Sequence, residues 1–279
     1  MSRMLRKALE GVLSAEECES IFSSFDQIGD IIIIRIPDVL LPKSGIIGRT
    51  LLDRIKPVRS VYRQSSDVRG DHRIRDLELV AGHDSTLTEY RENGCRFLVD
   101  VREAFFSPRL STERLRIAGQ VQDGETITNM FAGIGMFSIV SAKMARCTVY
   151  SIDINPQATE MCRRNISLNK MPGRVIPVCG DAADVIRDGL ADSSDRTLML
   201  LPERSDEFLE SAIQATKSGG TIHYYTHVHA DSRSEAAGMA EAHYTSTAHT
   251  RSEILDSRVV RAVGPRYYQS VVDVKITKE

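Results

Sequence analysis

The sequence predicts an α/β protein in which a Rossmann-like domain at residues 121–279 follows a small α+β domain at residues 1–120. The first observation is a βαβ pattern between Thr126 and Pro156, where apolar runs at 127–131 and 148–152 flank a helix-compatible segment. The second is that helix-like and strand-like segments are interspersed, without a repeat, in the residues before it. The third is the length of 279 residues, which is typical of about two domains.

The N-terminal domain is expected to begin with helices. Residues 1–13 have the pattern of an amphipathic helix, and residues 14–25 suit a second one, because Ser14 and Glu17 stand in capping-box register. A buried strand is predicted at 31–36, where most residues are β-branched. The later expected elements are a helix at 45–55, strands at 58–62 and 87–90, a hairpin turn at 92–94 and a strand at 96–101.

Composition and targeting signals exclude several classes of protein. No run of about 18 apolar residues exists, so no membrane partner is expected, and the N-terminus lacks the apolar centre of a secretory signal. We therefore expect a cytoplasmic protein, and we expect a monomer. The cysteines are odd in number, widely spaced and without a C-x-x-C pair, which favours buried thiols over disulfides or zinc at Cys18, Cys95, Cys147, Cys162 and Cys179.

A glycine loop follows the first strand of the βαβ pattern. Gly133 and Gly135 let the backbone approach a ligand closely, and Asp153 stands at the end of the second strand, where an acidic side chain can bind a ribose hydroxyl pair. The dinucleotide fingerprint is incomplete, because Phe137 and Ser138 stand where a small packing residue is needed and the turn has no basic residue. The pattern favours a nucleoside cofactor without a pyrophosphate, with an unliganded doubly wound domain as the alternative.

The order Phe-Ala-Gly-Ile-Gly at 131–135, Asp-Ile-Asn-Pro at 153–156 and Gly-Asp at 180–181 resembles the S-adenosylmethionine-dependent methyltransferases. The resemblance implies S-adenosyl-L-methionine as cofactor, with Asp153 on the ribose and Asp181 facing the adenine. The cofactor-binding residues that it implies are Phe105, Phe106, Asn129, Phe131, Gly133, Gly135, Asp153, Ile154, Asn155, Asp181, Ala182 and Leu200.

Charge is distributed unevenly along the chain. The segment from Lys43 to Arg75 contains nine Lys or Arg and three acidic residues, a local charge of +6 in a chain whose formal charge is -2. A basic field of this kind suits a phosphate-rich partner, because neutralised phosphates release counterions. A solvated surface with ordinary charge scatter is the alternative.

A second informative stretch, SPRLSTER at 107–114, has the pattern of a helix start and is expected to place Arg109 and Glu113 beside the cofactor domain. Position alone assigns neither a role, because a Glu in a first helical turn commonly interacts with the helix dipole.

Several stretches resemble, in order, the archaeal and eukaryotic-type tRNA (guanine-37 N1)-methyltransferases, from Ser24 to the end of the chain. They are SFDQIGDIIII, VRGDHRIRDLELVAG, ENGCRFLVDVREAFFSPRLSTERLRIA, the βαβ core and SGGTIHYYT. The resemblance implies a class I methyltransferase fold that acts on the anticodon loop of tRNA, in a compact form without the extra N-terminal module of many relatives. It assigns catalytic roles to Glu113, Arg73 and Arg109, and places Phe105 and Phe106 along the pocket, where plain core packing is an equal alternative.

The assigned roles fit the chemistry of guanine N1, which must lose its proton as it attacks the methyl group. Glu113 matches the family's general base, and Arg73 matches the cation that stabilises charge developing on O6. Such a base must leave its stack to reach the pocket, which suits a site between a basic domain and a cofactor domain.

Two departures and two alternatives accompany the resemblance. Leu200 stands where the family usually has an Asn that contacts the target base, and Asn129 replaces a first-strand Asp. The related aminocarboxypropyl transferases of wybutosine synthesis tend to lack Arg109-Leu110 and the Asp-Ile-Asn-Pro run at 153–156, so methyl transfer is favoured. A third interpretation is an RNA-binding homologue whose activity was lost with the Asn.

The C-terminal part carries the remaining polar residues. His223 lies in a predicted central strand at 221–226 and is expected to be a hydrogen-bonded core residue. The histidines lack the spacing of metal ligands, so no metal is expected. Residues 265–276 are predicted to form the antiparallel strand pair that closes such sheets.

Overall fold

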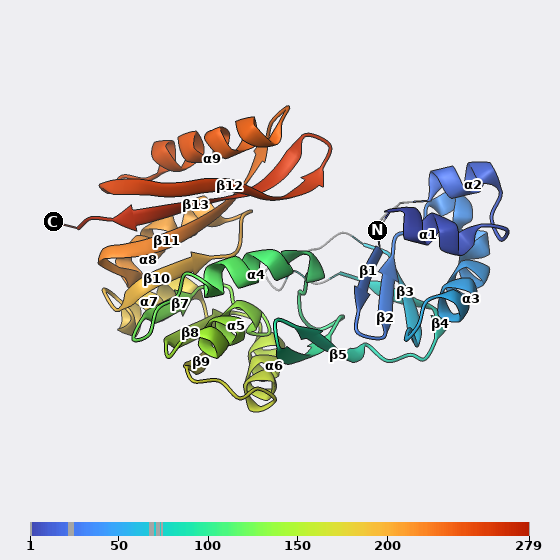
Figure 1. Ribbon diagram of the computed structural model, residues 1–279, viewed down its shortest axis with the longest axis horizontal. Coiled ribbons are helices and arrows are strands. Elements are labelled where there is room, and N and C mark those ends of the chain that lie inside the picture. The colour runs from blue at the N-terminus through green and yellow to red at the C-terminus, as the bar shows by residue number, and fades with distance from the viewer. Residues whose placement is uncertain (1, 22–24, 67–69, 71–72, 74, 279) are drawn as a thin grey trace. The chain divides into compact units, whose positions relative to one another are not determined.

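The computed structural model describes residues 2–21, 25–66, 70, 73 and 75–278 of the chain (Figure 1). The first residue of the family resemblance, Ser24, lies outside the described residues, as do Asp67, Arg69 and Asp71 of the basic segment. The chain divides into two compact units, Met1–Arg109 and Leu110–Glu279. This division falls before residue 120 because helix α4 (Ser111–Ala118) packs against helix α5 (Met136–Met144) of the second unit.

The first unit contains a four-stranded sheet of order β1-β2-β3-β4, in which β2 and β3 are parallel and the other neighbours are antiparallel. Strands β5 and β6 form a separate antiparallel hairpin. The elements are α1 (Ser2–Leu9), α2 (Ala15–Ser20), β1 (Phe25–Ile28), β2 (Ile31–Ile34), η1 (Asp38–Lys43), α3 (Ser44–Arg54), β3 (Ser60–Gln64), β4 (Leu77–Gly82), β5 (Leu87–Glu92), β6 (Cys95–Asp100) and η2 (Pro108–Leu110), whose last residue begins the second unit.

The predicted capping box is confirmed at the start of α2. The Ser14 hydroxyl accepts a hydrogen bond from the Glu17 backbone N–H, and the Glu17 carboxylate accepts one from the Ser14 N–H. The predicted extent of this helix was wrong, because α2 ends at Ser20 and Phe25 is already paired with Ile34 in strand β1. The apolar faces of α1 and α3 pack with β2 in a core that includes Leu5, Leu9, Ile32, Ile34, Ile47 and Leu51.

The second unit is built on a seven-stranded sheet of order β12-β13-β11-β10-β7-β8-β9. Strands β7 to β11 are parallel, and β13 and β12 are antiparallel, which confirms the Rossmann-like prediction. The closing antiparallel strands are present, but residues 265–276 contain only β13, because its partner β12 lies before them in the sequence. The elements after α4 are β7 (Thr126–Asn129), α5, β8 (Thr148–Asp153), α6 (Pro156–Ser167), β9 (Arg174–Cys179), α7 (Ala182–Gly189), β10 (Ser194–Met199), α8 (Ser205–Ala215), β11 (Thr216–His229), α9 (Arg233–Thr247), β12 (Ser252–Gly264) and β13 (Tyr267–Ile276).

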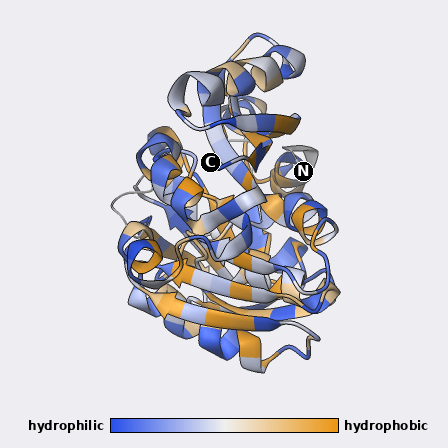
Figure 2. Ribbon diagram, turned by 90° about the vertical axis from the view of Figure 1, so that its left-hand side faces the viewer, coloured by the Kyte–Doolittle hydropathy of each residue, from blue (hydrophilic) through white to orange (hydrophobic). Residues whose placement is uncertain are grey.

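The strand order reverses between β7 and β10, where ligands of open α/β sheets bind beyond the carboxyl ends of the strands. Figure 1 shows α9 on one side of this sheet and α5 and α6 on the other. Figure 2 shows apolar residues concentrated on the strands, as expected for a sheet that is covered on both faces.

The two faces of β11 have different partners. Ile222, Tyr224 and Val228 point into the apolar core that includes residues of α7, α8 and α9. Because strand side chains alternate, the odd-numbered residues of β11 point to the opposite face, toward α4. This face carries the polar network described below.

Candidate active site

The glycine loop after β7 adopts a conformation that favours glycine. Gly133 and Gly135 have φ values of 54° and 86°. A Cβ atom on Gly135 would also lie 2.4 Å from the Cys162 Sγ atom. Both the positive φ and the lack of space therefore disfavour a side chain at this position. The first turn of α5 therefore begins close against the carboxyl end of the strands.

Asp153 joins the end of β8 to this loop. Its Oδ2 atom accepts a hydrogen bond of 2.6 Å from the Gly133 N–H, and its Oδ1 atom accepts one of 2.9 Å from the Asn155 N–H. A carboxylate oxygen has two lone pairs, so it can accept more than one hydrogen bond, including one from a hydroxyl donor. The Asp153 carboxylate, which is predicted to bind the ribose, is thus held in place by hydrogen bonds from the backbone of the loop.

The other predicted cofactor residues of this unit gather at the same edge of the sheet. Asn155 and Asp181 cap helices α6 and α7 through their side chains, so both have a structural task beside any contact with a ligand. Ile154 is 42% exposed, whereas Ala182 is buried. The half-buried Leu200 directly follows β10, and the Phe131 ring contacts Phe208 edge-to-face at 5.0 Å between centroids.

Asn129 has an unsatisfied buried atom. Its side chain is fully buried, and its Nδ2 atom donates to the Ser138 hydroxyl at 3.1 Å. Its Oδ1 atom has no hydrogen-bond partner among the described residues. A buried acceptor without a donor costs about 1–3 kcal/mol, so this atom is a candidate acceptor for a cationic ligand group.

Glu113 lies in the first turn of α4 and is 6% exposed. Its carboxylate accepts hydrogen bonds from the Arg116 guanidinium at 2.7–3.1 Å and from the Tyr225 hydroxyl at 2.6 Å. Burial raises the pKa of Tyr225 well above its ordinary value, so this hydroxyl keeps its proton and donates it to the carboxylate. The predicted base is thus fixed by an ion pair and a neutral donor.

Arg116 is shared between two carboxylates. Besides Glu113, it binds the buried Asp273 of β13, with 2.5 Å between Nη1 and Oδ2. Burial would lower the pKa of Arg116, but hydrogen bonds to both carboxylates raise it well above its ordinary value. The guanidinium therefore retains a partner if either carboxylate becomes neutral.

Asp273 continues the network to His223 and Arg196. His223 Nδ1 lies 2.6 Å from Asp273 Oδ1, and Nε2 lies 2.6 Å from Arg196 Nη1. Arginine is only a donor, so Nε2 accepts and Nδ1 carries the proton of a neutral ring. Burial lowers the pKa of His223 in agreement with this, and although burial would raise the pKa of Asp273, the bonds from His223 and Arg116 hold it well below its usual range.

His223 is therefore the hydrogen-bonded core histidine that the sequence predicted. Sequence reasoning missed the contributions of Arg116, Tyr225 and Asp273. The available signals were the i,i+3 spacing of Glu113 and Arg116 and the alternation along β11.

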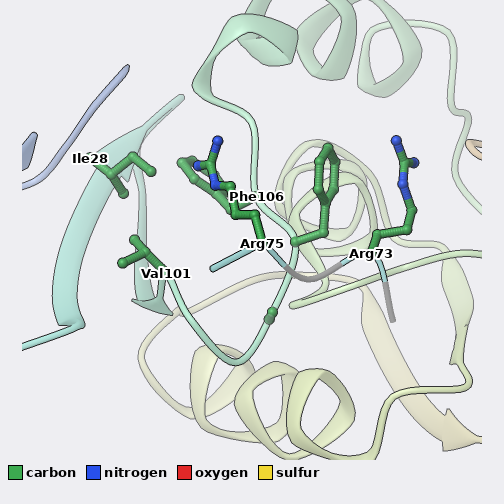
Figure 3. A pocket seen from close by; sticks show the side chains of 7 residues that line it. Ile28, Arg73, Arg75, Val101 and Phe106 are labelled. Atoms are coloured by element: carbon green, nitrogen blue, oxygen red, sulfur yellow. The ribbon is translucent and has the colours of Figure 1, made fainter. Parts of the chain in front are cut away.

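Arg73, the candidate cation of the first unit, lines a small pocket together with Phe105 and Phe106, whereas Arg109 is not among the residues that line it (Figure 3). Arg73 has a φ of 54°, and its guanidinium lies 4.2 Å from the centroid of the Phe105 ring, a cation–π distance. Figure 3 shows the guanidinium groups of Arg73 and Arg75 pointing to the same side of the pocket. The pocket is lined by Ile28, Arg73, Arg75, Val101, Ala104, Phe105 and Phe106.

Phe106 and Arg109 have partners within the first unit. Phe106 is 6% exposed and packs edge-to-face on Tyr90 at 4.9 Å, which is a core contact. Arg109 Nε lies 2.9 Å from Asp26 Oδ1, and Arg75 Nη1 lies 4.0 Å from Asp26 Oδ2. Burial lowers the pKa of Arg75, and Asp26 opposes this effect. One carboxylate thus lies beside two cations.

The basic segment is divided between paired and exposed cations. Arg63 binds Glu78 at 2.6 Å, and Arg54 donates to two backbone carbonyls near α1. Arg59 is 75% exposed, with Asp30 at 3.8 Å, so its guanidinium is accessible to a partner.

Four of the five cysteines are buried or half-buried. Cys95, Cys147 and Cys162 are buried and Cys18 is half-buried, but Cys179 is exposed because it ends the edge strand β9, so the prediction of a buried thiol was wrong there.

Within the described ranges, no three His, Cys, Asp or Glu side chains form a group that could hold a metal ion. The helices in the described part of the chain are all too short or too polar to span a bilayer.

Comparison with known proteins places this geometry in context. Residues 88–248 match the family described as the TRM5/TYW2 methyltransferase domain, and residues 5–86 match the TYW2 N-terminal domain. The tRNA (guanine(37)-N(1))-methyltransferase Trm5b of Pyrococcus abyssi is 39% identical over 91% of this chain and 75% of its own. The tRNA 4-demethylwyosine(37)-methyltransferase Taw21 of Saccharolobus solfataricus is 36% identical over 93% of this chain and 96% of its own.

Solved structures give the same relationship. The structure described as the complex of aTrm5 and tRNALeu is 34% identical, with a TM-score of 0.85 over 98% of this chain and 78% of that one. The TYW2 of P. horikoshii in complex with MeSAdo is 26% identical, with a TM-score of 0.76 over the whole of both chains. These similarities confirm the resemblance inferred from the sequence stretches.

Proposed function

Because this chain belongs to the TRM5/TYW2 methyltransferase family, we propose that it transfers a methyl group from S-adenosyl-L-methionine to N1 of guanosine 37 in tRNA. The observation that carries the proposal is the buried Glu113 carboxylate, which Arg116 and Tyr225 hold in place at the start of α4. A carboxylate held in this way is a positioned acceptor for the N1 proton of guanine.

The strand ends fit the cofactor. The unpartnered Oδ1 atom of Asn129 is a buried acceptor that suits an ammonium group, and Asp153 is a carboxylate of the kind that accepts from ribose hydroxyls. The backbone at Gly133 and Gly135 allows close approach of a ligand. When bound, S-adenosylmethionine would supply a methyl group on a sulfonium, an activated donor whose sulfur leaves as a neutral thioether with the electrons of the broken carbon–sulfur bond.

The residues of the second unit move the proton. Glu113 accepts the proton from guanine N1 as N1 attacks the methyl carbon, and its carboxylate becomes neutral. Arg116 then retains Asp273 as its anionic partner, so no buried cation is left unpaired. Tyr225 fixes the orientation of the carboxylate before and after transfer, which lowers the entropic cost of the step.

The first unit contributes cations in this proposal. Arg73 stabilises the negative charge that develops on guanine O6, and Phe105 supports its guanidinium by the contact at 4.2 Å. Arg109 and Asp26 form an ion pair that orients this region, and the exposed Arg59 binds a backbone phosphate of the tRNA. The anticodon-loop contacts, the monomeric state and the cytoplasmic location stay predictions.

A second candidate function is methylation of 4-demethylwyosine at the same position. Two observations favour it. Leu200 provides an apolar side chain where the family resemblance implies an amide, and the match to this chain covers 96% of the 4-demethylwyosine methyltransferase of S. solfataricus. An apolar group at this point tolerates a tricyclic base that offers fewer hydrogen bonds.

Methyl transfer to defined tRNAs tests both candidates. The protein is incubated with labelled S-adenosylmethionine and three tRNAs that carry guanosine, adenosine or 4-demethylwyosine at position 37, and the nucleosides are identified by mass spectrometry. We expect 1-methylguanosine with the first tRNA and no product with the second. Product only on 4-demethylwyosine would replace the first candidate with the second, and an aminocarboxypropyl adduct would overturn both.

A further inference from the structure

Three aromatic rings lie in a row at the carboxyl end of β11. The Tyr267 ring of β13 stacks on His229, with centroids 4.4 Å apart and planes at 26°, and its centroid is 5.1 Å from that of His227. The strand register pairs His229 with Tyr267, so the stack is fixed by backbone pairing. We call His227, Tyr267 and His229 the aromatic row.

The aromatic row continues the face that holds the proposed base. His223, Tyr225, His227 and His229 share one face of β11, and exposure rises along them from fully buried at His223 and Tyr225 to exposed at His229. Residues two apart on a strand are about 6–7 Å apart, so His227 and His229 lie roughly 7 and 13 Å beyond Tyr225. Tyr225 binds Glu113, and the row therefore leads outward from the proposed base to solvent.

Two arginines, Arg261 and Arg266, lie near the aromatic row. Arg261 of β12 donates from Nε to the buried Gln269, whose partner in β11 is His227, so it lies on the same face. Arg266 precedes Tyr267 and is 78% exposed, with Asp231 at 3.3 Å. Exposed rings beside guanidinium groups are the combination that binds unpaired nucleotides, because bases stack on rings while cations attract the phosphates.

We propose that the aromatic row is a stacking site for an unpaired RNA nucleobase next to the target nucleotide. This inference rests on the proposed function, because it needs tRNA as the partner and the target base at Glu113. Extrusion of the target exposes the faces of its neighbours, and His229 offers an accessible ring to one of them. A row that only stabilises the pairing of β11 and β13 is the competing explanation.

A fluorescent base separates the two explanations. Anticodon stem-loops carry guanosine 37 and 2-aminopurine on either its 5′ or its 3′ side, and fluorescence is measured during titration with protein. Stacking on an aromatic ring quenches 2-aminopurine, so we expect quenching at one of the two positions with the parent protein. His229→Ala should relieve this quenching, and His229→Ala with Tyr267→Leu should also weaken binding about tenfold.

His243→Ala is the matched control. His243 is also a partly exposed histidine beside a tyrosine, Tyr224, but it belongs to α9 on the other side of the sheet. This variant should quench like the parent. Thermal melting checks that each variant is folded. If the double variant is unfolded, the result with His229→Ala, which replaces an exposed side chain, decides between the two explanations.

The outcomes distinguish the inference from the proposed function. If the parent methylates guanosine 37 and His229→Ala quenches fully at both positions with parental affinity, the aromatic row is only structural and the inference is wrong. The same holds if the parent quenches at neither position. If the parent neither binds nor methylates the stem-loops, both the proposed function and the inference fall.

Discussion

Tyr225 donates its hydroxyl hydrogen to Oε1 of Glu113 across 2.6 Å, and both side chains are buried although 112 residues separate them in the sequence. The adjacent Tyr224 points to the opposite face of β11 and donates to Asp206 of α8. Two neighbouring tyrosines therefore each bind a carboxylate, but only one of these carboxylates is the proposed base.

This pair gives the first prediction. Tyr225→Phe removes one hydrogen bond from Glu113, so we expect the single-turnover rate of methyl transfer to fall about tenfold, corresponding to about 1.4 kcal/mol. Tyr224→Phe removes an equivalent bond and should cost similar stability, about 1 kcal/mol, at the parental rate. Rapid-quench kinetics and denaturant unfolding provide the two measurements. Equal rates for the two variants would assign Tyr225 a purely structural role.

The second prediction concerns the cofactor. Asp153→Ala should weaken S-adenosylmethionine binding by about 1.5–3 kcal/mol, because it removes charged hydrogen bonds to the ligand and releases the Gly133 N–H. Asp153→Asn retains an acceptor and should lose less. Isothermal titration calorimetry measures both affinities. Parental affinity of a folded Asp153→Ala protein would remove this residue from the ribose site.

The third prediction separates accessible from paired cations in the basic segment. Arg59→Gln should weaken tRNA binding for all sequences and reduce the slope of log K against log salt by about 0.9 or less, because roughly one phosphate contact is lost. Arg63→Gln should change the slope little, since Glu78 already binds Arg63. Filter-binding titrations across salt concentrations test this. Identical slopes for the parent and Arg59→Gln would show that Arg59 is solvated and contacts no phosphate of the tRNA.

The fourth prediction concerns Leu200, which follows β10 at the carboxyl edge of the sheet. An Asn at this position supplies a hydrogen-bonding group, so Leu200→Asn should raise the rate on guanosine 37 relative to the rate on 4-demethylwyosine 37. Competition between the two tRNAs, read by mass spectrometry, gives this ratio directly. An unchanged ratio would mean that residue 200 does not contact the base.

Local signals made the cofactor region predictable from sequence. The β7–α5–β8 unit, the two glycines and Asp153 lie within one short stretch, and the hairpin between β5 and β6 was predicted because Asn93 and Gly94 favour the positive φ values that they adopt. The capping box of α2 was equally local. In each case, the residues that determine the conformation are neighbours in the sequence of the residues that adopt it.

The remaining features depend on distant residues or on weak patterns. Arg116 binds Asp273 across 157 residues, and no local pattern indicates that this distant acid is its second partner beside Glu113. Strand β4 was missed because most of its side chains are at least partly exposed, which removes the alternation that marks a strand. The assignment of α4 to the second unit depends on its packing against α5, which the sequence of α4 alone does not indicate.

Single-turnover methyl transfer by Glu113→Gln tests whether Glu113 accepts the N1 proton of guanine. Glutamine keeps the size of the side chain and can still accept from Tyr225, while Asp273 still pairs Arg116, so folding and affinities for cofactor and tRNA should persist. We predict a rate loss on the order of 100-fold or more, because the amide cannot take the proton. Methylation of guanosine 37 at the parental rate by this variant would show that Glu113 is not the base.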